Sequence, residues 1–278
     1  MQIAPVAPRA ATVSFVSPSP LLGADSAAAA SLRAAGPSAA GGDLDKYYAT
    51  AQGKEGADLL HALHFIIRTG HVDRGYSQAR DELFSEIDDV DGDDKVEDLF
   101  TGESRGPITD RKNAYEKGFN TEHTWPQSQG ATGIAQSDLH HLRASDVKTN
   151  EVRGHMPYGD VVRTEWTTGS GAAQAKMGVD ALGTEVFEPH AAVKGDIARG
   201  LLYFYTRYAM SQTQRFSLEA FEHEVPTLLK WSAADPVDDA ERLRNDAVQR
   251  VQGNRNPFID HPEWVDAIHF DKLDLRHP

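Results

Sequence analysis

Apolar residues recur every three or four positions between residues 54 and 69, and Gly70 follows them. This spacing predicts a core helix over 54–69, and glycine is a common terminating residue. Three more predicted helices span 76–87, 194–210 and 236–253, and Gly253 is the predicted C-terminal cap of the last. We also expect one interrupted helix, with parts at 217–225 and 227–231, and a short tail helix that begins at Pro262.

Between residues 96 and 162 the pattern becomes shorter and more mixed. The candidate strands are "EDLFTG" at 97–102, "TEHTW" at 121–125, "DLHHL" at 138–142 and "YGDVV" at 158–162. Helices at both ends of the chain with short strands between them predict an α+β fold: a small mixed sheet surrounded by helices.

The first 42 residues are biased toward Ala, Pro, Ser and Gly. Such a composition buries little apolar surface, so we expect a disordered leader or linker over 1–42 and a folded domain over 43–278. The chain has no cysteine, which excludes disulfides and thiolate metal sites. It also has no run of about 18 apolar residues, so we expect no contact with the membrane interior.

The formal net charge of −14 argues against strong long-range attraction of nucleic acids. The charge is uneven, however. Residues 80–98 hold ten acidic and two basic residues, a net of −8, whereas residues 101–160 hold seven basic and eight acidic residues. The second segment therefore leaves room for a phosphate-binding groove.

The acidic segment "IDDVDGDDKVED" suggests a calcium loop, because Asp89, Asp91 and Gly92 fit loop positions three, five and six. Position one would then be Ile87, which has no oxygen ligand in its side chain. The pattern favours a solvated acidic loop over a calcium site.

Chemistry concentrates in "NTEHTWP", "DLHHL" and "SDVKTNEVRG". An adjacent pair such as Glu122 and His123 is weak evidence alone. The third segment predicts a short helix, capped by Ser145 or Asp146 and ended by Gly154, with Asp146, Asn150 and Arg153 on one face. A carboxylate and an amide oxygen suit Mg²⁺, although Asn150 on a wet surface explains the pattern equally well.

A zinc hydrolase is the competing interpretation of the histidines. On a strand, His140 and His141 point to opposite faces, which weakens a three-histidine site with His123. We expect His140, on the face of Asp138, and His141 to brace neighbouring loops. Zinc bound by His123 and one of the other two remains an alternative.

Phosphodiester hydrolysis fits the same residues. The attacking water and the leaving oxygen lie on opposite sides of phosphorus, so a base and a metal ligand need not point at one atom. His123 can therefore activate water while Glu122 and Asn150 hold a metal.

The segments "NTEHTWPQS", "DLHHLRASD" and "NEVRGHMPYGDV" resemble the endonuclease I family of secreted and periplasmic nucleases, in the ββα-metal (His-Me finger) group. The resemblance implies that Glu122 and Asn150 bind Mg²⁺, with Mn²⁺ or Ca²⁺ as alternatives, and that His123 is the general base. Some members carry a phosphate-contacting arginine in a segment with no match between residues 130 and 138. Arg153 is the first replacement candidate here and Arg143 the second.

The resemblance implies a sequence-nonspecific endonuclease acting on DNA, with RNA as a second substrate. The alternative is an inactive module that binds nucleic acid or calcium. Because free nuclease activity harms the producing cell, we expect secretion or periplasmic export, or a bound inhibitor protein. We also expect a monomer.

Overall fold

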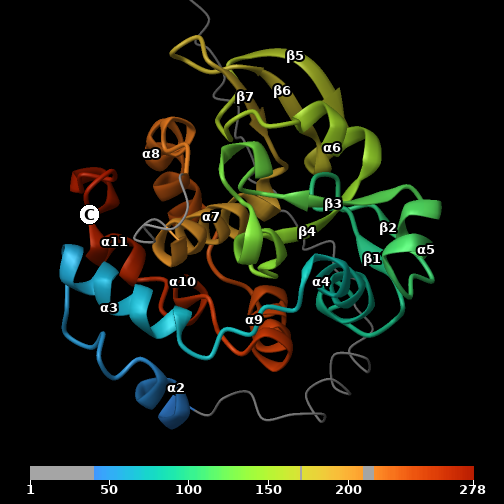
Figure 1. Cartoon of the computed structure of the whole chain (residues 1–278). Helices are drawn as coiled ribbons and strands as arrows, with labels where there is room; N and C mark the ends of the chain where they lie inside the picture. Colours follow the sequence, from blue (N-terminus) through green and yellow to red (C-terminus); the bar gives the residue numbers. More distant parts are fainter. Residues whose placement is uncertain (1–40, 170, 209–215) are drawn as a thin grey trace, which may run out of the picture.

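The computed structural model describes residues 41–169, 171–208 and 216–278 (Figure 1). The predicted leader lies outside them, except for residues 41 and 42 at the start of the first described helix. The helices are α2 (Gly41–Tyr47), α3 (Gly56–Arg68), α4 (Tyr76–Glu82) with a π-helical extension (Leu83–Ile87), α5 (Arg111–Glu116), α6 (Val147–Arg153), α7 (Lys194–Tyr208), α8 (Glu219–Ala234), α9 (Asp239–Gln252), α10 (Pro257–Asp260) and α11 (Trp264–Ile268). The strands are β1 (Val96–Glu97), β2 (Ser104–Arg105), β3 (Phe119–His123), β4 (Leu142–Asp146), β5 (Arg163–Thr168), β6 (Ala175–Val179) and β7 (Glu185–Glu188).

The predicted α+β class is confirmed, and the long helices lie where the spacing placed them. α3, α7 and α9 match their predicted ranges, and Gly253 ends α9 at a positive φ of 89°. The predicted interruption of α8 is wrong, since the helix continues through Pro226. Proline removes one backbone donor, but burial of Phe221 and Val225 on one side of α8 holds the helix together.

The expectation of a small mixed sheet is wrong. In the described part of the chain the strands form three separate antiparallel sheets, β1–β2, β3–β4 and β5–β6–β7. The strands β6 and β7 were not predicted. Their segments contain glycine and charged residues, which hide the alternation of apolar and polar positions.

Three predicted strands are misplaced. "DLHHL" is mostly a turn, and β4 begins only at Leu142, because Asp138 accepts a hydrogen bond from the backbone N–H of His140 and so turns the chain. "YGDVV" precedes β5 and forms one bridge between Tyr158 and Phe187. Of "EDLFTG" only Glu97 lies in a strand.

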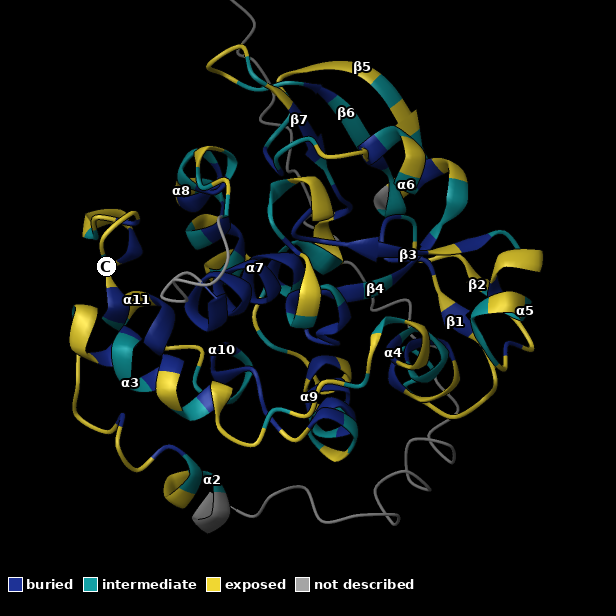
Figure 2. Ribbon diagram, in the orientation of Figure 1, coloured by how far each residue is buried: buried dark blue, intermediate teal, exposed yellow. Residues whose placement is uncertain are grey.

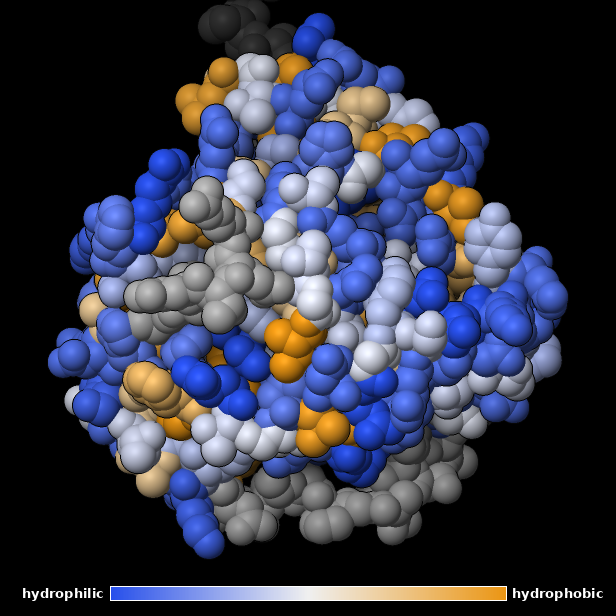
Figure 3. All heavy atoms as spheres, in the orientation of Figure 1, coloured by the Kyte–Doolittle hydropathy of each residue, from blue (hydrophilic) through white to orange (hydrophobic). Residues whose placement is uncertain are grey.

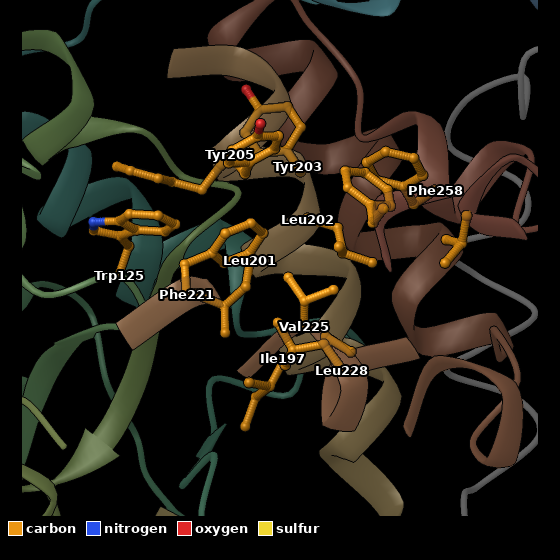
Figure 4. Packing of buried hydrophobic residues seen from close by; sticks show 14 of the residues in the cluster. Trp125, Ile197, Leu201, Leu202, Tyr203, Tyr205, Phe221, Val225, Leu228 and Phe258 are labelled. Carbon is orange, nitrogen blue, oxygen red and sulfur yellow. The ribbon is translucent and has the colours of Figure 1, made fainter. Parts of the chain in front are cut away.

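Helix α7 is the centre of the main hydrophobic core, with α3, α8 and α10 packed around it (Figures 1 and 4). Trp125, just after β3, stacks on Phe204 of α7 with a ring separation of 4.8 Å, and Tyr205 stacks on Phe221 of α8 at 4.7 Å. These contacts fix the end of β3 against the most buried helix of the molecule.

A second hydrophobic cluster packs β3 and β4 against α4 and its extension. It includes Phe84, Phe119 and Leu142, all with an exposed fraction of 1% or less. β3 is accordingly buried along most of its length, whereas the outer faces of α3 and α5 are exposed (Figure 2). The face shown in Figure 3 is mostly hydrophilic, with small separate hydrophobic patches. Among the described helices, none combines the length and the apolar character needed to cross a membrane.

Candidate active site

The strands β3 and β4 and the helix α6, which pack on one another, carry the predicted site residues Glu122, His123 and Asn150. Glu122 pairs with Arg143 and His123 with Leu142 across the antiparallel strands. α6 follows β4 directly, because the Asp146 carboxylate caps it by accepting hydrogen bonds from the backbone N–H groups of Lys148 and Thr149. The predicted helix from Asp146 to Gly154 is confirmed.

Glu122 lies on the side of β3 that faces α6. Its side chain is 2% exposed, and its Oε1 atom lies 3.1 Å from Arg153 Nη1 and accepts a hydrogen bond of 3.2 Å from Tyr158. Both contacts use Oε1, and no described residue donates a hydrogen bond to Oε2. Burial raises the pKa of Glu122 to about 7, and Arg153 opposes this shift. Oε2 is therefore the oxygen available to a cation.

Asn150 projects from the middle of α6, the helix that packs on β3 and β4. Its Nδ2 atom is buried and has no hydrogen-bond partner among the described residues. Burying an unpaired polar group is costly, so this amide needs an explanation beyond helix formation. Rotation of the amide by 180° places its oxygen at the same position, where it would serve as a ligand.

His123 lies on the opposite side of β3. Its Nε2 atom is 3.2 Å from the Gln136 carbonyl oxygen, and Gln127 Nε2 lies 3.3 Å from Nδ1. A proton on Nε2 satisfies the carbonyl and leaves the Nδ1 lone pair as an acceptor. Burial and the neighbouring His141 lower the pKa of His123 to about 3, so the imidazole is neutral near pH 7.

The two arginines proposed for phosphate contact are both paired within the protein. The Arg153 side chain is 1% exposed and donates hydrogen bonds to the carbonyl oxygens of His123 and Thr124 at 3.2 and 2.8 Å, in addition to its ion pair with Glu122. Arg143 forms an ion pair of 2.7 Å with Asp196. We therefore revise the role of Arg153: its contacts favour the positioning of Glu122 over the binding of substrate phosphate.

The three supporting residues form a buried centre behind the site. Asp138 accepts hydrogen bonds from Tyr203 and Tyr208, each of 2.8 Å. Although burial opposes ionisation, nearby histidines and a hydrogen bond from Gln252 hold the pKa of Asp138 below its ordinary value. Nε2 of His140 lies 3.2 Å from the Asn254 carbonyl oxygen, and Nε2 of His141 lies 2.7 Å from that of Ala135.

These histidine contacts suit the predicted bracing of loops. Among the described residues one group of three potential ligands has its ligand atoms within 4.8 Å of one another, and it contains no histidine. The three-histidine site is therefore absent from that part of the chain. The group is Asp89, Asp91 and Asp93 in the acidic loop, which is largely exposed.

One cation near His123 escaped the sequence analysis. Arg80 of α4 contributes to the lowered pKa of His123 and stacks on Tyr76, whose ring lies 5.5 Å from the His123 ring. Within the described part of the chain it forms no ion pair, and its Nε atom is buried without a partner. A lone arginine on a predicted helix carries no motif, so only the three-dimensional structure reveals its place.

Comparison with known proteins identifies the family. The family model for endonuclease I matches residues 57–263. The chain is 36% identical over 250 residues to an extracellular ribonuclease of Bacillus subtilis (strain 168), a match that covers 85% of this chain and 83% of the relative. It is 37% identical over 240 residues to an extracellular ribonuclease of Bacillus amyloliquefaciens, covering 81% and 78%. An extracellular deoxyribonuclease of Aeromonas hydrophila is 31% identical over 127 residues, covering 45% of this chain and 50% of the relative. The chain therefore belongs to the endonuclease I family and is an endonuclease.

Proposed function

We propose that the protein is a metal-dependent, sequence-nonspecific endonuclease whose active site is the β3–β4–α6 unit, a ββα-metal core. The observation that carries the proposal is the setting of His123: a neutral imidazole, oriented by the Gln136 carbonyl at 3.2 Å, on the residue that follows Glu122 in β3. A nucleophile-activating base held by a second group is the arrangement that general-base catalysis requires.

Glu122 and Asn150 would hold the metal ion. The donor set suits Mg²⁺, which accepts few protein oxygens and completes its shell with water and substrate phosphate. The Oε2 atom of Glu122 and the unpartnered amide of Asn150 support this assignment. A divalent cation held by these two residues would supply positive charge to the phosphate and to the leaving oxygen. Mn²⁺ and Ca²⁺ have the same preference for oxygen ligands and are the alternatives.

His123 acts on a water molecule. Its Nδ1 atom takes a proton from the water while the water oxygen forms a bond to phosphorus. The bond between phosphorus and the leaving oxygen breaks on the opposite side. The phosphate anion raises the pKa of His123 when substrate binds, because a nearby negative charge favours the imidazolium form. Arg153 keeps Glu122 in place throughout this step.

The substrate is proposed to be DNA, with RNA as a second substrate. The two Bacillus relatives are named ribonucleases and the Aeromonas relative a deoxyribonuclease, so both polymers fall within the range of the chain's relatives. Because these relatives are named extracellular, we propose export from the producing cell, with a protein inhibitor as the alternative safeguard. We propose that the enzyme acts as a monomer.

Cleavage of supercoiled plasmid tests the metal site. Asn150→Ala should raise the Mg²⁺ concentration for half-maximal cleavage more than about tenfold, whereas its exposed neighbour variant Glu151→Ala should behave as wild type. Cleavage that persists in EDTA, or equal effects of the two substitutions, would contradict the proposal. If the intact protein binds nucleic acid but does not cleave it with any divalent ion, the inactive binding module is supported instead.

A further inference from the structure

A cavity of about 410 Å³ lies beside the candidate active site and is not used in the mechanism above. It is open to solvent and is bordered by α4 with its π-helical extension, by α5 and by the first half of β3. Its lining residues are Arg80, Phe84, Arg111, Lys112, Tyr115, Glu116, Phe119, Asn120 and Thr121. Its volume lies within the range of small-ligand sites, which is about 300–1,000 Å³.

The cavity runs along the first half of β3 toward His123. Phe119, Asn120 and Thr121 line it, and strand alternation places Thr121 on the same side of the strand as His123. Arg80 also lines it and stacks on Tyr76, whose ring centroid lies 5.5 Å from that of the His123 ring. A nucleotide in the cavity would therefore be adjacent to the phosphate that His123 faces.

The charge of the cavity is opposite to that of the protein. It is lined by three cations, Arg80, Arg111 and Lys112, and one carboxylate, Glu116. Arg111 is partly neutralised by its ion pair with Asp81, but Arg80 pairs with no described residue. In a chain of formal charge −14, this local excess of cations is suited to a phosphate.

An aromatic ring lies at the rim. Tyr115 lines the cavity, yet it is 66% exposed, which is unusual for an aromatic side chain in the described part of this protein. An exposed ring next to cations is the arrangement with which proteins bind unpaired bases by stacking. The base of a duplex is stacked and paired already, so it cannot use this ring.

We propose that this cavity is a subsite for one unpaired nucleotide next to the scissile phosphate, with Arg80 and Lys112 on its phosphate and Tyr115 stacked on its base. The inference rests on the proposed function for the position of the scissile phosphate. It assigns single-stranded nucleic acid as the substrate form that binds most tightly.

Fluorescence anisotropy with a labelled single-stranded thymidine 12-mer, in EDTA to prevent cleavage, tests the subsite. Tyr115→Ala should raise the Kd about tenfold, but should change the Kd of a hairpin duplex by less than about twofold. Lys112→Ala should reduce the slope of log Kd against log salt by about 0.7, and Arg80→Gln should do the same.

The matched controls are Phe65→Ala, another exposed aromatic residue at 60% exposure, and Lys54→Ala, an exposed lysine next to α3. Figure 1 shows α3 and α5 on opposite sides of the molecule.

Competition identifies the ligand. The concentration of thymidine 5′-monophosphate that displaces the 12-mer should be about tenfold lower than the concentration of inorganic phosphate that does so. If the two competitors are equally potent, the cavity does not recognise a nucleotide and the proposal is overturned. If the cavity variants bind as the controls do while the wild type cleaves with metal, the subsite is overturned and the proposed function stands. If the cavity variants lose binding while the wild type fails to cleave with every divalent ion tried, the subsite is supported and the proposed function fails.

Discussion

The buried ion pair between Glu122 and Arg153 controls how the candidate metal ligand is held. Their side chains are 2% and 1% exposed, so removal of the arginine leaves a carboxylate buried without its partner. Arg153→Met should lower the free energy of unfolding by about 3–5 kcal/mol. It should also weaken Mn²⁺ binding, because Glu122 then takes up a proton. Urea unfolding and calorimetric titration with Mn²⁺ measure the two effects.

The matched control is Arg143→Met, because Arg143 lies on the partner strand β4 and forms an ion pair with Asp196 of α7. It should destabilise the fold without changing the affinity for Mn²⁺. An equal loss of Mn²⁺ affinity in the two variants would argue against a specific role of Arg153. If Arg153→Met does not fold, Arg153→Lys provides a milder test of the same contact.

At the residue scale, the sequence singled out candidate residues but not their surroundings. Glu122, His123 and Asn150 were chosen because short motifs surround them, and they stay a prediction. The role of Arg153 was not recognisable, since a helix face shared with Asn150 says nothing about burial. Arg80 was missed altogether, because its proximity to His123 depends on the packing of α4 against β3 and β4.

At the scale of elements, the position of Asn150 depends on where α6 begins. Asp146→Ala removes the carboxylate cap and should lower the free energy of unfolding by about 1 kcal/mol. Because the first turn then frays, Asn150 is less well ordered, and Mn²⁺ affinity should fall several-fold. Thermal unfolding and calorimetric titration provide the measurements.

Asp238→Ala removes the corresponding cap of α9, where the carboxylate accepts a hydrogen bond from the backbone N–H of Glu241. A similar loss of stability with unchanged Mn²⁺ affinity is expected. Should both variants bind Mn²⁺ as wild type does, the cap of α6 would have no influence on the site.

The long helices were predictable because their apolar residues recur over three or more turns, as in α3 and α7. The short strands were not. Residues 138–142 were predicted as a strand, but the side chain of Asp138 accepts a hydrogen bond from the backbone N–H of His140 and turns the chain. Contacts between distant segments decide such cases, and a local pattern does not contain them.

At the scale of the whole molecule, buried neutral histidines make stability depend on pH. The pKa values of His140 and His141 fall to about 4 on folding, chiefly because burial disfavours the charged ring. Between pH 6.5 and 4 the unfolded chain therefore binds protons that the folded chain does not, so stability falls as the pH falls. From pH 7 to pH 5 the loss is about 2 kcal/mol for each such histidine.

Urea unfolding at pH 7 and pH 5 measures this loss. His140→Gln should reduce it, because glutamine can donate to the same carbonyl oxygen without titrating. The exposed side chain of His277 provides the control, and His277→Gln should leave the loss unchanged. Because buried carboxyls such as Glu122 have a raised pKa and shift the stability in the opposite direction, the comparison between variants is the test. If His140→Gln changes its stability between the two pH values as the wild type does, the expected neutrality of His140 is contradicted.

The central claim is that His123 activates the attacking water. Single-turnover cleavage of supercoiled plasmid, with Mg²⁺ and with EDTA, tests it most directly in the wild type and in His123→Ala. We expect the wild type to cleave only with the metal, and a folded His123→Ala protein to cleave about 10²–10⁴-fold more slowly. If His123→Ala, folded by circular dichroism, cuts as fast as the wild type, His123 is not the general base.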